Sequence, residues 1–192
     1  VSHYVRSGTQ LDREAKKRGN STYLVGEVVP MLPHRLSSGI CSLVEAEERL
    51  VKSVLFRFSK DGKLLGSKLA ESVIKSDKRL TYEQAILFMK EKDLEKIRSA
   101  KPPPSRYSGN PGRPLRELTN EQLSELKEVI EKLWRVAAQV RRYRMKGGSL
   151  DFASSEVKIL VNDKGEPEEI IQSESDESHQ LIEEFMLLAN ET

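Results

Sequence analysis

The sequence predicts an α+β (mixed α/β) fold with two β-hairpins and one long helix. Glycine-containing turns at residues 60–62 and 162–165 each separate two apolar runs, which is the pattern of a hairpin. Between the two turns, apolar residues recur at every third or fourth position from Leu123 to Val140, which indicates an amphipathic helix. A chain of 192 residues suits a single domain.

Composition limits the class of protein. Acidic and basic residues nearly balance, and the net charge of +2 permits nucleic-acid binding without arguing for it. No apolar run approaches the length of a membrane span, so no membrane partner is expected. Cys41, the one cysteine, cannot form an internal disulfide and lies in an apolar run. We therefore expect it to be a small buried residue in a protein of a reducing, cytoplasmic compartment.

The N-terminal residues are predicted to form a strand and a short helix. Residues 1–5 show a period-two pattern, which favours a strand. Thr9 is a suitable N-cap and Gly19 a suitable stop for a helix over residues 10–18. The basic residues of this helix fit a solvated face, which is the ordinary case, or a phosphate-contacting edge.

Residues 21–43 form a nearly uncharged segment in a chain that is otherwise rich in charge. Pro30 and Pro33 bias the residues before them away from helix, so the segment is predicted to be an ordered, extended crossing. It contains enough apolar residues to be buried, and Tyr23 stands at its entrance. A buried irregular segment needs local partners for its backbone groups, so we expect the surrounding fold to be shaped to it.

The first hairpin is predicted to pair residues 50–59 with residues 63–74, since both runs are rich in Val, Leu and other apolar residues. Gly62 in the connecting turn tolerates the positive φ that such turns need.

A short helix is predicted after this hairpin. Thr81 and Gln84 have the spacing of a capping box, in which two side chains satisfy free backbone N–H groups at a helix start. The spacing places Tyr82 in the first turn of a helix that ends near Lys90.

A proline-rich surface insertion is predicted at about residues 101–118. Its proline clusters favour extended, solvated backbone. The segment fits a docking site for a proline-recognising partner, but a surface insertion of variable length is the more common case.

The longest helix is predicted over residues 120–145, after a second capping-box pattern at Thr119 and Gln122. Its apolar stripe consists of Leu123, Leu126, Ile130, Leu133, Ala137 and Val140. Basic residues crowd its end, namely Arg141, Arg142, Arg144 and Lys146. These charges fit complementation of the helix dipole and fit a phosphate-facing patch, and the sequence leaves both open.

The second hairpin is predicted to pair residues 156–161 with residues 169–172. Ser175 or Asp176 is placed to cap a final helix from His179 onward.

No self-contained catalytic site is visible in the sequence. It has no phosphate-binding glycine loop, no paired cysteines and no Gly-x-Ser-x-Gly turn. His179 and Glu183 lie four residues apart on a predicted helix, where a weak helical ion pair is the ordinary interpretation and a shared metal ion the sharper one. For His3 and His34 we expect structural roles. No metal ligand is therefore assigned in this chain.

Sequence blocks along the whole chain resemble one known family, in that family's order. Thr-Tyr-Leu at 22–24, Val-Pro-Met-Leu-Pro at 29–33 and Leu-Ser-Ser-Gly-Ile-Cys-Ser-Leu at 36–43 closely resemble the RNB-type catalytic domain of the ribonuclease II / ribonuclease R family of 3′-to-5′ exoribonucleases. Further matching blocks lie at residues 1–6, 11–15, 79–84, 148–152 and 181–191.

The resemblance implies that residues 1–192 are a partial catalytic domain of an enzyme that hydrolyses single-stranded RNA to nucleoside 5′-monophosphates. In the family, the 3′ end of the RNA enters a narrow channel where two aromatic side chains clamp the terminal bases. Tyr23 and Phe152 match these two positions, and bases stack on aromatic faces whatever the sequence. Tyr82 and Glu183 match positions that contact the terminal nucleotides and their ribose hydroxyls. Glu184 is not assigned a role.

The resemblance also implies Mg²⁺ held by an aspartate cluster. The chain has no Asp-x-Asp-Asp run, so this cluster is expected upstream of Val1 and a later arginine-containing motif beyond Thr192. We therefore expect this chain alone to be inactive. Departures from the family pattern at residues 25–26, Ser38 and 153–155 concern the geometry of the channel.

Two other functions stay open. One is a non-catalytic relative that holds RNA without cutting it, and recovery of activity on adding the missing segments would exclude it. The other is an interaction module that docks a partner through its long helix and residues 101–118.

Overall fold

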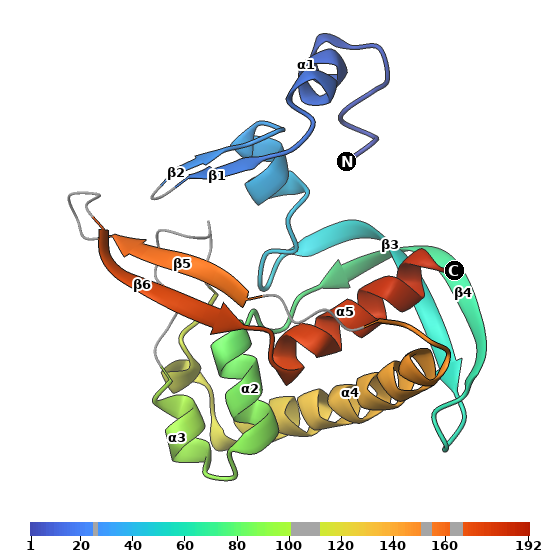
Figure 1. Ribbon diagram of the computed structural model, residues 1–192, viewed down its shortest axis with the longest axis vertical. Helices are drawn as coiled ribbons and strands as arrows, with labels where there is room; N and C mark the ends of the chain where they lie inside the picture. The colour runs from blue at the N-terminus through green and yellow to red at the C-terminus, as the bar shows by residue number, and fades with distance from the viewer. Residues whose placement is uncertain (25–26, 101–111, 151–154, 162–166) are drawn as a thin grey trace.

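The computed structural model describes residues 1–24, 27–100, 112–150, 155–161 and 167–192 (Figure 1). Its elements, in chain order, are α1 Gln10–Arg18, β1 Thr22–Leu24, β2 Glu27–Val29, the π-helix η1 Arg35–Ile40, β3 Glu48–Phe58, β4 Leu64–Lys75, α2 Tyr82–Lys90, α3 Leu94–Arg98, the 3₁₀ helix η3 Leu115–Glu117, α4 Asn120–Lys146, β5 Ser155–Val161, β6 Pro167–Glu174 and α5 Glu177–Asn190. The mixed α+β class predicted from the sequence is confirmed.

The strands form separate antiparallel hairpins, and the described hairpins do not join into one sheet. β3 pairs with β4 from Glu48 opposite Lys75 to Phe58 opposite Leu64, and Gly62 in their turn has a φ of 81°. β5 pairs with β6, although residues 162–166 between them lie outside the described part. Both predicted hairpins are therefore confirmed, and the pairing of β1 with β2 adds a third that was not predicted.

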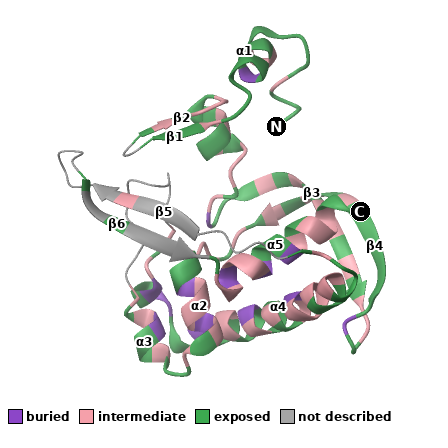
Figure 2. Cartoon of the chain, in the orientation of Figure 1, coloured by how far each residue is buried: buried purple, intermediate pink, exposed green. Residues whose placement is uncertain are grey.

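Helices α2 to α5 pack together in one layer, in which α4 contacts each of the other three. α2, α3 and α5 all contact α4, and α2 also contacts α5 (Figure 1). The buried cluster between the helices comprises Phe88, Ile97, Leu115, Leu118, Leu123 and Ile130. Figure 2 shows the buried positions on the facing sides of these helices. No helix among the described residues has the length and apolarity needed to cross a membrane.

Both capping boxes lie where the sequence predicts them. Thr81 Oγ1 accepts a hydrogen bond from the backbone N–H of Gln84, and Gln84 Oε1 accepts one from the backbone N–H of Thr81, so α2 begins at Tyr82. Thr119 and Gln122 make the same reciprocal bonds at the start of α4. These bonds satisfy N–H groups that a helix start leaves free.

The proline-rich insertion is described only in part, because residues 101–111 lie outside the described residues. Leu115 and Leu118 are 1% and 3% exposed and belong to the buried cluster. The C-terminal end of the predicted insertion is therefore part of the core.

Two expectations for the N-terminal third are wrong. Residues 1–5 form a turn, because the N–H groups of Tyr4 and Val5 bond back to the carbonyl of Val1 at 2.9 and 3.0 Å. The predicted extended crossing over residues 21–43 is extended only in β1 and β2 and then turns into η1.

The crossing is also more exposed than its apolar composition predicts. Tyr23 is 78% and Leu43 52% exposed, and Cys41 is only half-buried. Its backbone groups are paired partly within the segment, by the β1–β2 hairpin and η1, and partly from outside it, since the carbonyls of Pro30 and Ser42 accept hydrogen bonds from Arg18 Nη1 and Arg49 Nε.

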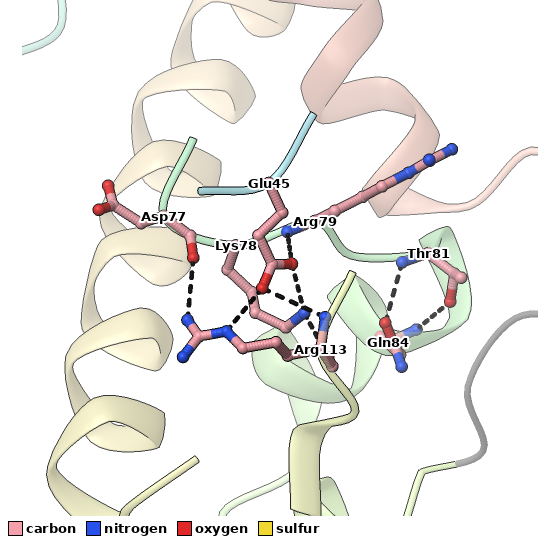
Figure 3. Close-up of polar contacts among 7 residues, drawn as sticks. All are labelled: Glu45, Asp77, Lys78, Arg79, Thr81, Gln84 and Arg113. Atoms are coloured by element: carbon pink, nitrogen blue, oxygen red, sulfur yellow. Dashed lines mark hydrogen bonds and ion pairs between the residues drawn. The ribbon is translucent and has the colours of Figure 1, made fainter. Parts of the chain in front are cut away.

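A buried carboxylate joins three distant segments of the chain (Figure 3). Glu45, whose side chain is 2% exposed, accepts hydrogen bonds from Lys78 Nζ at 2.7 Å and from Arg113 Nε at 2.9 Å. It also accepts one from the backbone N–H of Arg79 at 2.9 Å. Gly112 closes over it, because a Cβ at this position would lie 2.2 Å from Glu45 Oε2. We call Glu45, Lys78, Arg79, Gly112 and Arg113 the Glu45 node.

The partners of Glu45 hold it in its ionised form. Burial raises the pKa of this carboxyl, but the hydrogen bonds from Arg79, Lys78 and Arg113 outweigh burial and lower the pKa to about 2. The folded state therefore binds this proton less readily than the unfolded chain, in which a value near 4.5 is expected. The corresponding stability is fully present above about pH 4.5 and is lost as pH falls toward 2.

Replacing Glu45 with Gln should lower the free energy of unfolding at pH 7 by about 3–5 kcal/mol, because it leaves buried Lys78 without its anion. In the same variant, the free energy of unfolding should fall less between pH 4.5 and pH 3 than in the wild type, because protonation of Glu45 no longer contributes to the loss. Urea unfolding at pH 7, 4.5 and 3 measures both effects. Glu128→Gln, in an exposed ion pair on α4, is the matched control and should change little. Equal pH dependence in the two variants would contradict the assignment.

Candidate nucleic-acid interface

The junction of α2 and α5 brings polar and aromatic side chains together. Tyr82, the first residue of α2, stacks on His179 of α5 with ring centroids 3.7 Å apart and planes 18° from parallel. The two helices are joined again by Lys90 Nζ and Glu177 Oε2 at 2.8 Å. Tyr82 is still 41% exposed, so a ligand can reach this junction from solvent.

Asp176 fixes the position of His179. It is the N-cap of α5, where its Oδ1 accepts from the N–H groups of Ser178 and His179 at 2.9 and 3.3 Å. The same oxygen lies 2.9 Å from His179 Nδ1. Burial raises the pKa of Asp176, but the hydrogen bonds from Ser178 and His179 outweigh it and leave the pKa below its usual range. The carboxylate is therefore ionised at neutral pH.

Glu183 lies one helical turn after His179 on α5, so both project from the same face of the helix. Its side chain is 50% exposed, and its Oε1 lies 3.5 Å from Nη2 of Arg144. The helical ion pair considered for His179 and Glu183 is not what the structure shows, because His179 bonds to Asp176. Two predicted site residues, Tyr82 and Glu183, thus flank His179. We call Tyr82, Asp176, His179 and Glu183 the α2–α5 cluster.

The other two predicted site residues are not brought to this cluster. Tyr23 lies on β1 opposite Val28, in a hairpin that stands apart from α2 and α5 in Figure 1. Tyr23 is 78% exposed there and accessible to a ligand. Phe152 lies outside the described residues.

Glu184 is a buried residue that sequence reasoning missed. Its side chain is 1% exposed and accepts from Arg141 Nη1 at 3.1 Å. Arg144 donates two hydrogen bonds to the same carboxylate, from Nε at 3.1 Å and from Nη2 at 2.6 Å. Arg141 and Arg144, part of the basic cluster at the end of α4, therefore neutralise a buried carboxylate. This role differs from the two considered from the sequence, complementation of the helix dipole and a phosphate-facing patch. The signal in the sequence was two arginines three residues apart, Arg141 and Arg144, together with an acidic residue, Glu184, within the apolar run of the last helix.

The described residues show no metal site, since no three His, Cys, Asp or Glu side chains among them are grouped to hold an ion. A cavity of about 650 Å³ opens between the β3–β4 turn and the ends of α4 and α5. Its walls are mainly apolar and include Arg144 and Glu184, but neither Tyr82 nor His179. The chemistry of the α2–α5 cluster, hydroxyl, imidazole and carboxylate, suits recognition of hydroxyl groups.

Known proteins resemble this chain along its full length. The family model "RNB domain" matches residues 1–192. Ribonuclease R of Thermotoga maritima is 40% identical over 192 residues, which is 100% of this chain and 24% of that protein. Mycoplasma genitalium RNase R in complex with ribose methylated single-stranded RNA superposes with a TM-score of 0.76 at 28% identity, covering 100% of this chain and 26% of that one.

The same Mycoplasma genitalium enzyme in complex with double-stranded RNA gives a TM-score of 0.78 at 28% identity, with 100% of this chain and 30% of that chain covered. This chain thus spans about a quarter of the length of the ribonucleases it matches.

Glu183 and Glu184 form a matched pair for a stability test. Glu184→Gln should cost about 3–5 kcal/mol, because Arg141 and Arg144 lose a buried anion. Glu183→Gln removes only a half-exposed ion pair and should cost at most about 1 kcal/mol. Urea unfolding followed by the fluorescence of the single tryptophan, Trp134 of α4, reports both values. Similar losses in the two variants would show that burial of Glu184 does not contribute as described.

Proposed function

The chain belongs to the RNB domain family of ribonuclease R and ribonuclease II, and from that membership we propose that it forms part of a 3′-to-5′ exoribonuclease. The proposed substrate is single-stranded RNA, released as nucleoside 5′-monophosphates. The observation that carries the proposal is the match of the family along all 192 residues. The relative from Mycoplasma genitalium, bound to single-stranded RNA, supports the choice of ligand.

The α2–α5 cluster is proposed to contact the ribose of the terminal nucleotides. The phenol of Tyr82 can donate and accept a hydrogen bond, and the Glu183 carboxylate accepts one. A ribose 2′-hydroxyl offers both functions and is absent from DNA. The stack on His179 holds Tyr82 in place before any ligand arrives, which lowers the ordering cost of binding.

Tyr23 and Phe152 are proposed to stack on bases. The exposure of the Tyr23 ring supports this role, because an aromatic face that is already accessible needs no rearrangement to receive a base. Such stacking is tolerant of base sequence. For Phe152 the proposal rests on the family motif alone.

The cofactor of the complete enzyme is proposed to be Mg²⁺, bound by residues outside this chain. The support is the short span of the chain relative to its relatives and its lack of an Asp-x-Asp-Asp run. Mg²⁺ would stabilise the attacking and leaving oxygens of the phosphodiester. A reducing, cytoplasmic location is part of the proposal and agrees with the free thiol of Cys41.

Replacing Tyr23 or Tyr82 with Ala should weaken the binding of a labelled oligoadenylate to this chain. For Tyr23, loss of one stacked base predicts a rise in Kd of about 5- to 150-fold. Fluorescence anisotropy at fixed salt measures the change. Tyr143→Ala, which removes a 55% exposed tyrosine of α4, is the control and should leave Kd unchanged. Equal effects at all three tyrosines would argue for non-specific binding instead.

The chain alone should leave a labelled RNA at full length when Mg²⁺ is added. Shortening of the RNA by the pure chain would overturn the proposed place of the metal ligands. Joining the chain to the rest of its protein should produce Mg²⁺-dependent shortening. RNA binding without shortening in that longer protein would instead identify a non-catalytic relative.

A further inference from the structure

His179 of the α2–α5 cluster has a defined tautomer. The Asp176 carboxylate can only accept a hydrogen bond, so the 2.9 Å contact with Nδ1 requires the hydrogen on that nitrogen. A neutral imidazole with its hydrogen on Nδ1 carries its free lone pair on Nε2. The N-cap bonds of Asp176 to Ser178 and His179 keep this carboxylate in place.

The second ring nitrogen of His179 is available to a ligand. No hydrogen bond from any described residue reaches Nε2, and the side chain is 29% exposed. Tyr82 covers one face of the ring at 3.7 Å. An imidazole held by a carboxylate at one nitrogen and by an aromatic stack on its face presents the other nitrogen in a fixed direction.

The charges around His179 select a neutral partner. On its own helix it has the carboxylates of Asp176 and Glu183, and from α2 it has the uncharged phenol of Tyr82. Of the cations that bind α5 carboxylates, Lys90 of α2 is engaged by Glu177, and Arg144 of α4 by Glu184 and Glu183. Two carboxylates repel an RNA phosphate but attract the hydrogen of a hydroxyl group.

We infer that His179 Nε2 accepts a hydrogen bond from a ribose 2′-hydroxyl and is a specificity-determining residue of the α2–α5 cluster. The inference rests on the proposed RNA-binding function and adds a third hydroxyl-recognising group to Tyr82 and Glu183. Asp176 is its positioning residue, since it sets the tautomer. A site with several such groups rejects a nucleotide that lacks the hydroxyl, because its polar atoms then stay unpaired.

The purely structural alternative is that His179 serves only to pack on Tyr82 and to bond the N-cap. His179→Phe distinguishes the two, because phenylalanine keeps an aromatic ring on Tyr82 and removes both nitrogens. His179→Gln is the companion variant, which keeps a polar side chain but loses the stack. Far-UV circular dichroism of each variant checks the fold.

The binding test compares two short oligoadenylates, one all-ribose and one with deoxyribose at its last two nucleotides. The wild-type chain should bind the all-ribose form more tightly. His179→Phe should lose about 3- to 10-fold of affinity for the all-ribose form, as expected for one hydrogen bond, and nothing for the deoxy-ended form. Loss of equal size for both forms would assign His179 a packing role and overturn the inference.

A spectroscopic test needs no variant. In a long-range proton–nitrogen spectrum of the imidazole rings, His179 should carry its hydrogen on Nδ1. Adding the all-ribose oligoadenylate should shift the Nε2 resonance, and adding the deoxy-ended form should not. The inference is overturned if the Nε2 chemical shift of His179 does not change with either oligoadenylate, or changes equally with both.

The outcomes separate this inference from the proposed function. If the wild-type chain prefers the all-ribose form and His179→Phe keeps the full preference, the inference fails and the proposed function stands. If the wild-type chain binds neither form, or shows no preference between them, recognition of a ribose by this cluster fails as a whole.

Discussion

The hydrogen bonds of the buried Glu45 carboxylate connect parts of the structure that have few other links. The described hairpins do not pair with one another, so no continuous sheet holds the strands together. Glu45 instead binds the chain before β3 to the exit of β4, through Lys78 and the N–H of Arg79, and to Arg113 ahead of α4. A buried charge with this many partners tolerates few alternative arrangements, because every displaced partner leaves part of the charge uncompensated.

The residues of the α2–α5 cluster lie close along the chain to two such buried carboxylates. Just before α2, the Glu45 node fixes Arg79, two residues before the capping residue Thr81 (Figure 3), and Tyr82 follows that cap. In α5, Glu184 binds Arg141 and Arg144 of α4, and its neighbour on the chain is Glu183. Tyr82 therefore directly follows a capping residue, and Glu183 directly precedes a buried carboxylate. This is the preorganisation that a selective binding site requires.

Local signals predicted the starts of α2 and α4 and the turn at Gly62, because each depends on residues only a few positions apart. The Glu45 node could not be predicted in this way, since Glu45 lies 33 residues from Lys78 and 68 from Arg113. The same reason explains why the stack of Tyr82 on His179, 97 residues further along the chain, was not predicted. For residues 21–43, apolar composition suggested burial, but local pairing in the hairpin and η1 left much of the segment exposed.

The close contact of Gly112 with Glu45 restricts which residues these two positions can accept during evolution. Its φ is 77°, and a Cβ at this position would lie only 2.2 Å from Glu45 Oε2. Any other residue there would therefore both strain the backbone and displace the carboxylate. In a protein without an acidic residue at position 45, the contact with the carboxylate would no longer require a glycine at position 112, although the positive φ would still favour one. The two positions should therefore change together among homologues, as a co-varying pair separated by the β3–β4 hairpin, two helices and the proline-rich segment.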